Sequence, residues 1–132
     1  DFKFMIKVLK ISFFSMTIVT IITFPFIENI VLILGGEYLT NSVEVIKIIL
    51  VSVPIIVISF TLATNCINAL GYYKLRFNCM IITTLFYLVF ILVGYYAGWV
   101  NNIQFYAYVI VVVYVIELLC RLFYVNKYKM LK

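Results

Sequence analysis

The fold is decided by residues 77–125, FNCMIITTLFYLVFILVGYYAGWVNNIQFYAYVIVVVYVIELLCRLFYV, where only AGWVNN at 97–102 separates two long apolar runs. An α-helix rises about 1.5 Å per residue, so one unbroken helix over this stretch would be about 70 Å long. That is more than twice the roughly 30 Å hydrocarbon core of a bilayer. Gly and paired Asn favour a tight turn, and Trp99 suits the headgroup level. The stretch therefore predicts a hairpin of two transmembrane helices, at about 77–98 and 103–125.

Two further apolar segments, at about 11–34 and 46–70, are also long enough to cross a membrane. The chain is 67% hydrophobic and 11% charged, whereas soluble domains are roughly half apolar and a quarter charged. A chain of 132 residues has too little interior to hide that much apolar surface. We predict an all-α polytopic membrane protein with four transmembrane helices, part of a larger helical bundle. Because the sequence begins with Asp1 and ends in NKYKMLK, we expect it to be the C-terminal part of a longer chain.

Lysine and arginine are concentrated at alternate ends of the four predicted spans. The flanking cations are Lys3, Lys7 and Lys10 before the first span, Lys74 and Arg76 in the second loop, and Lys127, Lys129 and Lys132 in the tail. The first loop, at 35–47, has Glu37 and Glu44 against Lys47, and the turn at 97–102 is uncharged. Cytoplasmic flanks of membrane helices are enriched in Lys and Arg. This pattern predicts that both termini are cytoplasmic, and it explains the net charge of +5 without a nucleic-acid partner.

Local sequence chemistry agrees with the limits of the second span. Asn41 and Glu44 are spaced as a capping box at its start, with Asn41 as the N-cap. Gly71 follows its last apolar residue, where a glycine commonly ends a helix. Tyr72 and Tyr73 come next, at the level of the aromatic belt.

The same span carries four polar residues near its cytoplasmic end. Thr61, Thr64, Asn65 and Asn68 have the spacing i, i+3, i+4 and i+7, which places them on one face of an α-helix. Unsatisfied amides are costly in hydrocarbon, so such a face meets either water or a neighbouring helix. The two interpretations are a wall of a central cavity and a hydrogen-bonded seam between helices.

Glu117 and Arg121 are the only opposite charges inside a predicted span, and they are four residues apart in the order that favours a helical ion pair. Ionisable residues within membrane spans are functional candidates. Both lie in the cytoplasmic third of the last span, where Arg121 is also able to snorkel to the interface. The pair therefore indicates either local pairing or anchoring, or a role in substrate or ion coupling.

Two prolines lie inside predicted spans, Pro25 in the first and Pro54 in the second. Each frees a backbone carbonyl and bends its helix. Prolines are tolerated in membrane helices, so each one indicates either a plain kink or a hinge used in transport.

The residues that most enzymes need are missing from the sequence. It contains no histidine, and no nucleotide-binding glycine loop or nucleophile–base set. Cys66, Cys79 and Cys120 lack CxxC spacing and all lie in apolar segments, which favours buried free thiols over a disulfide or zinc site. We therefore expect a protein that is not an enzyme and that uses no metal or cofactor.

A family resemblance rests on two segments: ILGGEYLTNSVEVIKIILVSVPI at 33–55 and NALGYYKLRF at 68–77. They resemble the C-terminal part of bacterial polysaccharide flippases, the O-antigen repeat-unit transporters of the multidrug/oligosaccharidyl-lipid/polysaccharide exporter superfamily. Gly36, Glu37 and Tyr38 match that family's Gly-acidic-Tyr turn between two helices. Ala69, Gly71 and Lys74 match its cytoplasmic loop of small residues, Gly and Lys.

The resemblance implies a complete transporter of about a dozen helices around a central cavity, in a bacterial cytoplasmic membrane. It would flip an undecaprenyl-diphosphate-linked oligosaccharide for surface polysaccharide, lipopolysaccharide or O-antigen synthesis, among membrane lipids and other glycan-assembly membrane proteins. Cations on the cytoplasmic side would attract the diphosphate, although such cations also follow from topology alone. The candidate substrate-binding residues are Thr61, Thr64, Asn65, Asn68, Lys74, Arg76, Glu117 and Arg121.

Three other functions fit the same sequence. One is a multidrug or other secondary exporter of the same superfamily, which would need a cation-coupling acidic site. Another is a membrane-anchored enzyme of the same glycan pathway, although short loops and the lack of histidine argue against it. The last is a four-helix structural or assembly subunit.

Overall fold

The computed structural model describes residues 2–36 and 42–128, which are helical and contain no strand. The helical elements are α1 (Phe2–Thr23), the 3₁₀ turn η1 (Phe24–Phe26), α2 (Ile27–Gly35), α3 (Val43–Thr61), the π-helix η3 (Leu62–Asn68), α4 (Tyr73–Tyr96), the 3₁₀ turn η4 (Trp99–Asn101) and α5 (Ile103–Lys127). Four continuous helical segments are long and apolar enough to cross a membrane: Lys3–Gly35, Val43–Asn68, Tyr73–Tyr96 and Ile103–Lys127. The prediction of an all-α, multi-pass membrane protein is confirmed.

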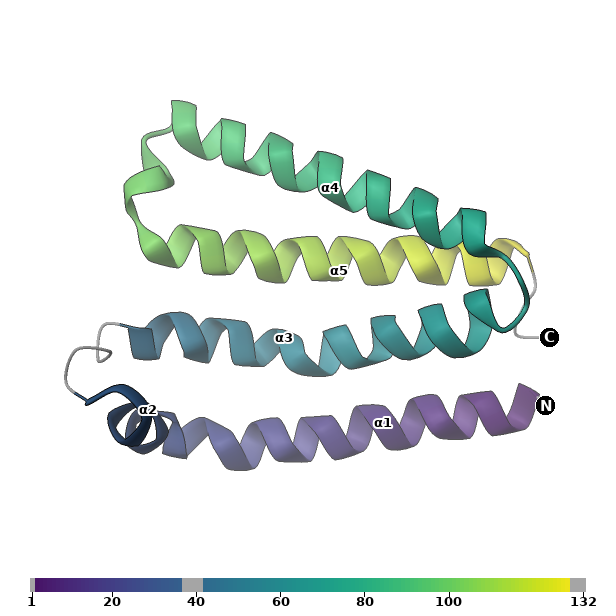
Figure 1. The fold of residues 1–132 in the computed structure, drawn as a ribbon, viewed down its shortest axis with the longest axis horizontal. Coiled ribbons are helices and arrows are strands. Elements are labelled where there is room, and N and C mark those ends of the chain that lie inside the picture. Colours follow the sequence, from purple (N-terminus) through teal and green to yellow (C-terminus); the bar gives the residue numbers. More distant parts are fainter. Residues whose placement is uncertain (1, 37–41, 129–132) are drawn as a thin grey trace.

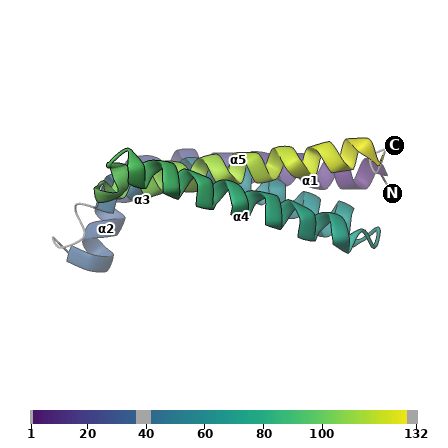
Figure 2. The same cartoon turned by 90° about the horizontal axis from the view of Figure 1, so that it is seen from above.

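The long helices lie side by side in one layer, in the order α1, α3, α5, α4 (Figure 1). The pair α3 and α5 makes the most extensive contact, and α1 and α4 are the edge helices. Seen from above, the layer is thin (Figure 2). A single layer has little interior, and the fully buried side chains gather where α3 and η3 meet α5 and α4. The largest of them are Leu62, Ile67, Val125, Cys66, Cys79, Ser52 and Ser59.

The start of α1 and the end of α5 lie at the same end of the layer, hereafter the termini end (Figure 1). The start of α3 and the turn between α4 and α5 lie at the opposite end, hereafter the distal end. Four antiparallel spans put both termini on the same side of the membrane, as the alternation of charges predicts. That this side is cytoplasmic stays a prediction.

The first span differs from the sequence prediction of one kinked helix over 11–34. The helix α1 begins at Phe2 and ends at Thr23, and its 22 residues are about 33 Å long, enough to cross the bilayer alone. Pro25 lies in the 3₁₀ turn η1, and α2 then turns out of the layer (Figure 2). Proline has no N–H to donate and its ring clashes with the carbonyl four residues earlier, so the α-helix is interrupted there. Pro54, in contrast, lies inside α3 without breaking it.

The predicted hairpin is confirmed. The helix α4 ends at Tyr96 and α5 begins at Ile103, after a turn in which Gly98 has a left-handed backbone. The side chain of Asn102 caps α5 by accepting a hydrogen bond from the backbone N–H of Gln104 at 2.9 Å.

The start of α3 is only partly described. Its N-cap is Ser42, without a side-chain hydrogen bond, and the predicted N-cap Asn41 lies outside the described residues. The carboxylate of Glu44, the other half of the predicted capping box, accepts a hydrogen bond from the side chain of Gln104. Glu44 therefore links the start of α3 to the start of α5.

Gly71 ends the second span as predicted. Its φ is +77°, and the backbone N–H groups of Tyr72 and Gly71 donate to the carbonyls of Ile67 and Asn68, each at 2.9 Å. These two bonds form a Schellman motif, in which a left-handed residue satisfies the last carbonyls of a helix.

Replacing Gly71 with alanine should lower the free energy of unfolding of the full-length protein by about 1 kcal/mol. A Cβ atom added at Gly71 would meet nothing within 4 Å, so the loss comes from the left-handed backbone and not from a clash. Unfolding in mixed detergent micelles, followed by circular dichroism, measures the loss. Asparagine tolerates this backbone better, so Gly71→Asn should be the milder variant. Equal losses for both variants would contradict this explanation.

Candidate functional site

The most unusual feature of the layer is a buried cation between its two central helices. Arg121 of α5 is only 6% exposed. Its Nη1 donates a hydrogen bond to the Oγ of Ser59 on α3 at 2.8 Å, and its Nη2 donates to the carboxylate of Glu117 one turn earlier on α5. The predicted ion pair of Glu117 and Arg121 is thus formed. The snorkelling interpretation of Arg121 is wrong in this structure, because the guanidinium is held between α3 and α5.

Ser59 was not among the residues singled out from the sequence. Together with Ser52 and Cys66 it forms a series of small residues spaced seven apart, all of which are buried. Small residues let membrane helices approach closely, and hydroxyls offer hydrogen bonds across the contact. This spacing was the available signal that one face of the second span packs against another helix.

The charges of the Arg121 cluster (Ser59, Glu117 and Arg121) balance each other. The side chains of Arg121 and Glu117 are 8% and 17% exposed, and they neutralise each other within apolar surroundings. Arginine stays protonated, so its charge must always be balanced there. Its Nε is buried and has no partner in the described residues. An anion that replaces Glu117 would find a guanidinium already desolvated and able to donate two parallel hydrogen bonds.

The four polar residues of the second span do not share one face, and that prediction is wrong. The end of this span is a π-helix, η3, in which each hydrogen bond skips one more residue than in an α-helix. A π-helix turns less per residue, so positions three and seven apart fall out of line. Thr61 is buried and Asn65 is exposed, while Thr64 and Asn68 are half-buried.

Within the described residues, their hydrogen bonds do not form the predicted seam between helices, whereas the wall of a central cavity stays a prediction. The hydroxyl groups of Thr61 and Thr64 donate to carbonyls of their own helix, those of Val57 at 2.7 Å and Phe60 at 2.9 Å. The Oδ1 of Asn68 is buried and has no partner within residues 2–36 and 42–128. Within that part of the chain, none of the four side chains bonds to another helix. They therefore form no hydrogen-bonded seam among these helices.

The predicted cytoplasmic cations Lys74 and Arg76 lie in the first turn of α4, at the termini end. Lys74 is exposed and Arg76 is half-buried. Neither forms an ion pair with another described residue. Neither residue is hydrogen-bonded to the Arg121 cluster.

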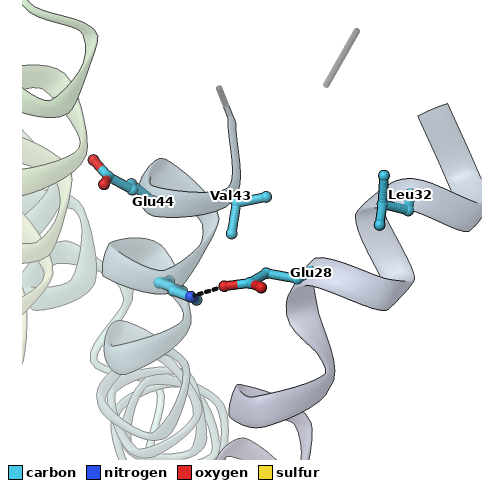
Figure 3. Close-up of a pocket in the computed structure, with 5 residues that line it drawn as sticks. Glu28, Leu32, Val43 and Glu44 are labelled. Carbon is cyan, nitrogen blue, oxygen red and sulfur yellow. Dashed lines mark hydrogen bonds and ion pairs between the residues drawn. The ribbon is translucent and has the colours of Figure 1, made fainter. Parts of the chain in front are cut away.

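A second polar site lies at the distal end, where sequence analysis singled out no binding residues. Glu28 of α2 accepts a hydrogen bond and ion pair from the Nζ of Lys47 on α3 at 2.7 Å (Figure 3). Lys47, which was assigned to the first loop, lies in the second turn of α3. With Leu32, Val43 and Glu44, these residues line a cleft of about 340 Å³. Figure 3 shows Glu44 pointing away from Glu28, so the two carboxylates have separate partners.

Two features thus distinguish this unit from a plain set of membrane anchors: a hydrogen-bonded charge pair inside the membrane, and a span broken at Pro25. Comparisons of the chain with protein-family models, with curated proteins and with solved structures found no match.

Proposed function

We propose that this chain is the C-terminal transmembrane domain of a flippase that moves lipid-linked oligosaccharide repeat units across a bacterial cytoplasmic membrane. The substrate would be an undecaprenyl-diphosphate-linked oligosaccharide for surface polysaccharide or O-antigen. The observation that carries the proposal is the Arg121 cluster, a desolvated guanidinium within a membrane span. The resemblance at residues 33–55 and 68–77 supports the family, and the antiparallel spans with both termini on one side are consistent with it.

The chemistry of the cluster suits a diphosphate. Guanidinium and phosphate match as bidentate partners, and charged residues within membrane spans commonly mark a substrate pathway. In this proposal Arg121 binds the diphosphate in exchange for Glu117, which holds the guanidinium in place while no substrate is bound. Lys74 and Arg76, at the same end of the layer, attract the anionic head group from the membrane surface.

The polar residues at the end of the second span have unequal parts in this proposal. Asn65 is exposed on the four-helix layer, so its amide is available to a sugar or to a helix outside the described residues. Thr61 and Thr64 satisfy their hydroxyl groups within their own helix, which argues against direct substrate contacts. The buried Oδ1 of Asn68 still requires a donor.

The test uses the full-length protein in a strain that lacks its own flippase. Wild type should restore surface glycan, and Glu117→Gln should lower the rate of restoration by about tenfold, the value of one charge-assisted hydrogen bond. The amount of protein in the membrane should stay unchanged. Glu44→Gln is the matched control, because it removes one carboxylate at the distal end and leaves the Arg121 cluster intact.

Three outcomes would count against the proposal. Failure of wild type to restore surface glycan would contradict the substrate class. Drug efflux in place of glycan restoration would favour a multidrug exporter. Full activity of Glu117→Gln would refute the role of the Arg121 cluster while leaving the substrate class standing.

A further inference from the structure

The helix α2 is attached to the rest of the layer by few contacts. Ile27 and Val31, one turn apart, are buried at 2% and 4% exposure. The remaining aliphatic side chains of α2 are exposed: Ile30, Leu32, Ile33 and Leu34, at 39–83%. Segments with few buried apolar contacts open at low free-energy cost. The ion pair of Glu28 with Lys47 is the one polar link between α2 and α3 within the described residues.

The connection between α1 and α2 has the features of a hinge. Three residues, Phe24–Phe26, form a 3₁₀ turn around Pro25, and short 3₁₀ stretches within a helix often mark hinges. A groove of about 410 Å³ lies at this point between α1 and α3, lined in part by Pro25 and Pro54. Each proline leaves a carbonyl of its own helix without the usual N–H donor. The hydroxyl of Thr20, also at the groove, is buried without a partner in the described residues.

We propose that α2 is a hinged flap at the distal end and that the ion pair of Glu28 with Lys47 is the latch that holds it against α3. The flap turns about Phe24–Phe26. When the latch opens, Ile27 and Val31 are the buried side chains that still hold α2 to the described layer, and a rotation about η1 removes both from their contacts. The inference rests on the contacts of α2 and does not depend on which substrate is transported.

The latch is a partly exposed ion pair, and such pairs are weak. Its two side chains are 31% exposed at Lys47 and 65% exposed at Glu28, and both lie at the distal end, beyond the length of α1 that already crosses a bilayer. Salt weakens interactions between exposed charges. The other carboxylate at the cleft, Glu44, is engaged with Gln104 of α5 and does not compete for Lys47 in this structure. The latch therefore responds to ionic strength, whereas Ile27 and Val31 do not.

Hydrogen–deuterium exchange of the full-length protein in lipid nanodiscs tests the latch. The amides of residues 27–35 should exchange several-fold faster in Glu28→Lys and in Lys47→Glu than in wild type. The double variant Glu28→Lys/Lys47→Glu should return them toward the wild-type rate, because it rebuilds the pair with reversed charges. High salt should speed the same amides in wild type and in the double variant, which both have the ion pair, but not in the two single variants. Glu44→Gln is the matched control and should leave α2 unchanged.

A distance measurement separates a swing of the flap from simple fraying. Spin labels replace Ile33 on α2 and Phe60 on α3, both exposed, in a variant with alanine at all three cysteines. Opening should add a second population of label distances in Lys47→Glu, which disappears in the double variant. Unchanged exchange of α2 in both single variants would overturn the latch. Faster exchange with one unchanged distance would overturn the hinge.

Discussion

Replacing Glu117 with alanine should lower the free energy of unfolding by about 3–5 kcal/mol, the largest stability loss that we expect from a single substitution here. The variant leaves the guanidinium of Arg121 between α3 and α5 without its counter-charge, bonded only to Ser59. A buried cation cannot discharge by losing its proton when it is an arginine. Unfolding of the full-length protein in mixed micelles, followed by circular dichroism, measures the loss.

Two further variants show whether the loss comes from the unpaired charge. Glu117→Gln keeps a carbonyl acceptor beside Arg121, so it should be less destabilising than alanine. The double variant Glu117→Leu/Arg121→Leu removes both charges and fills the space, and buried ion pairs replaced in this way commonly regain stability. If the cluster binds substrate, the double variant should be stable but should not restore surface glycan. A loss below about 1 kcal/mol in Glu117→Ala would show that Arg121 reaches water after all, since exposed pairs contribute no more than that.

The number of spans and their antiparallel course were predictable because the bilayer sets both. A span needs about 20 apolar residues whatever its neighbours are. The hairpin was predicted at 77–98 and 103–125, and the structure has α4 at Tyr73–Tyr96 and α5 at Ile103–Lys127. Gly, Trp and Asn mark the turn between them by local chemistry alone, and the same holds for Gly71 at the end of the second span.

The break in the first span was only half predictable. A proline indicates a bend, but Pro54 leaves α3 continuous while Pro25 ends α1. The difference lies in the contacts that the next helical turn makes. Ile27 and Val31 become buried when α2 turns out of the layer and contacts α3. No local sequence pattern predicts this tertiary contact.

The candidate site was the least predictable part. The polar residues of the second span were placed on one face by assuming α-helical geometry, and the π-helix η3 invalidates that assumption. A π-helix adds one residue to a turn and has no reliable sequence signal. The pairing of Glu117 with Arg121 was predictable because it is local. Its third member, Ser59, comes from a helix 62 positions away in sequence, and no local rule joins them.

Gly94 of α4 lies against Phe105 of α5, and Gly94→Ala should lower the free energy of unfolding by about 1–3 kcal/mol. A Cβ atom added at this buried glycine would lie 2.2 Å from Cζ and 2.5 Å from Cε1 of Phe105. The ring of Phe105 also packs against the ring of Trp99, and the two ring centres are 6.0 Å apart. An aromatic ring is stiff, so α4 and α5 must separate at the distal end to admit the methyl group.

The partner side chain provides the control for this clash. Phe105→Leu alone loses some apolar contact, but Gly94→Ala/Phe105→Leu should be more stable than the sum of the two single losses implies, because the smaller side chain makes room for the methyl group. Strict additivity would show that Phe105 turns aside without strain.

The location of the change is equally informative. Gly94→Ala should speed hydrogen exchange near the turn at 97–102 and leave Arg121 protected, since these two contacts lie at opposite ends of α5. If both ends loosen together, α4 and α5 unfold as one cooperative unit, and the Arg121 cluster then depends on packing along the whole hairpin.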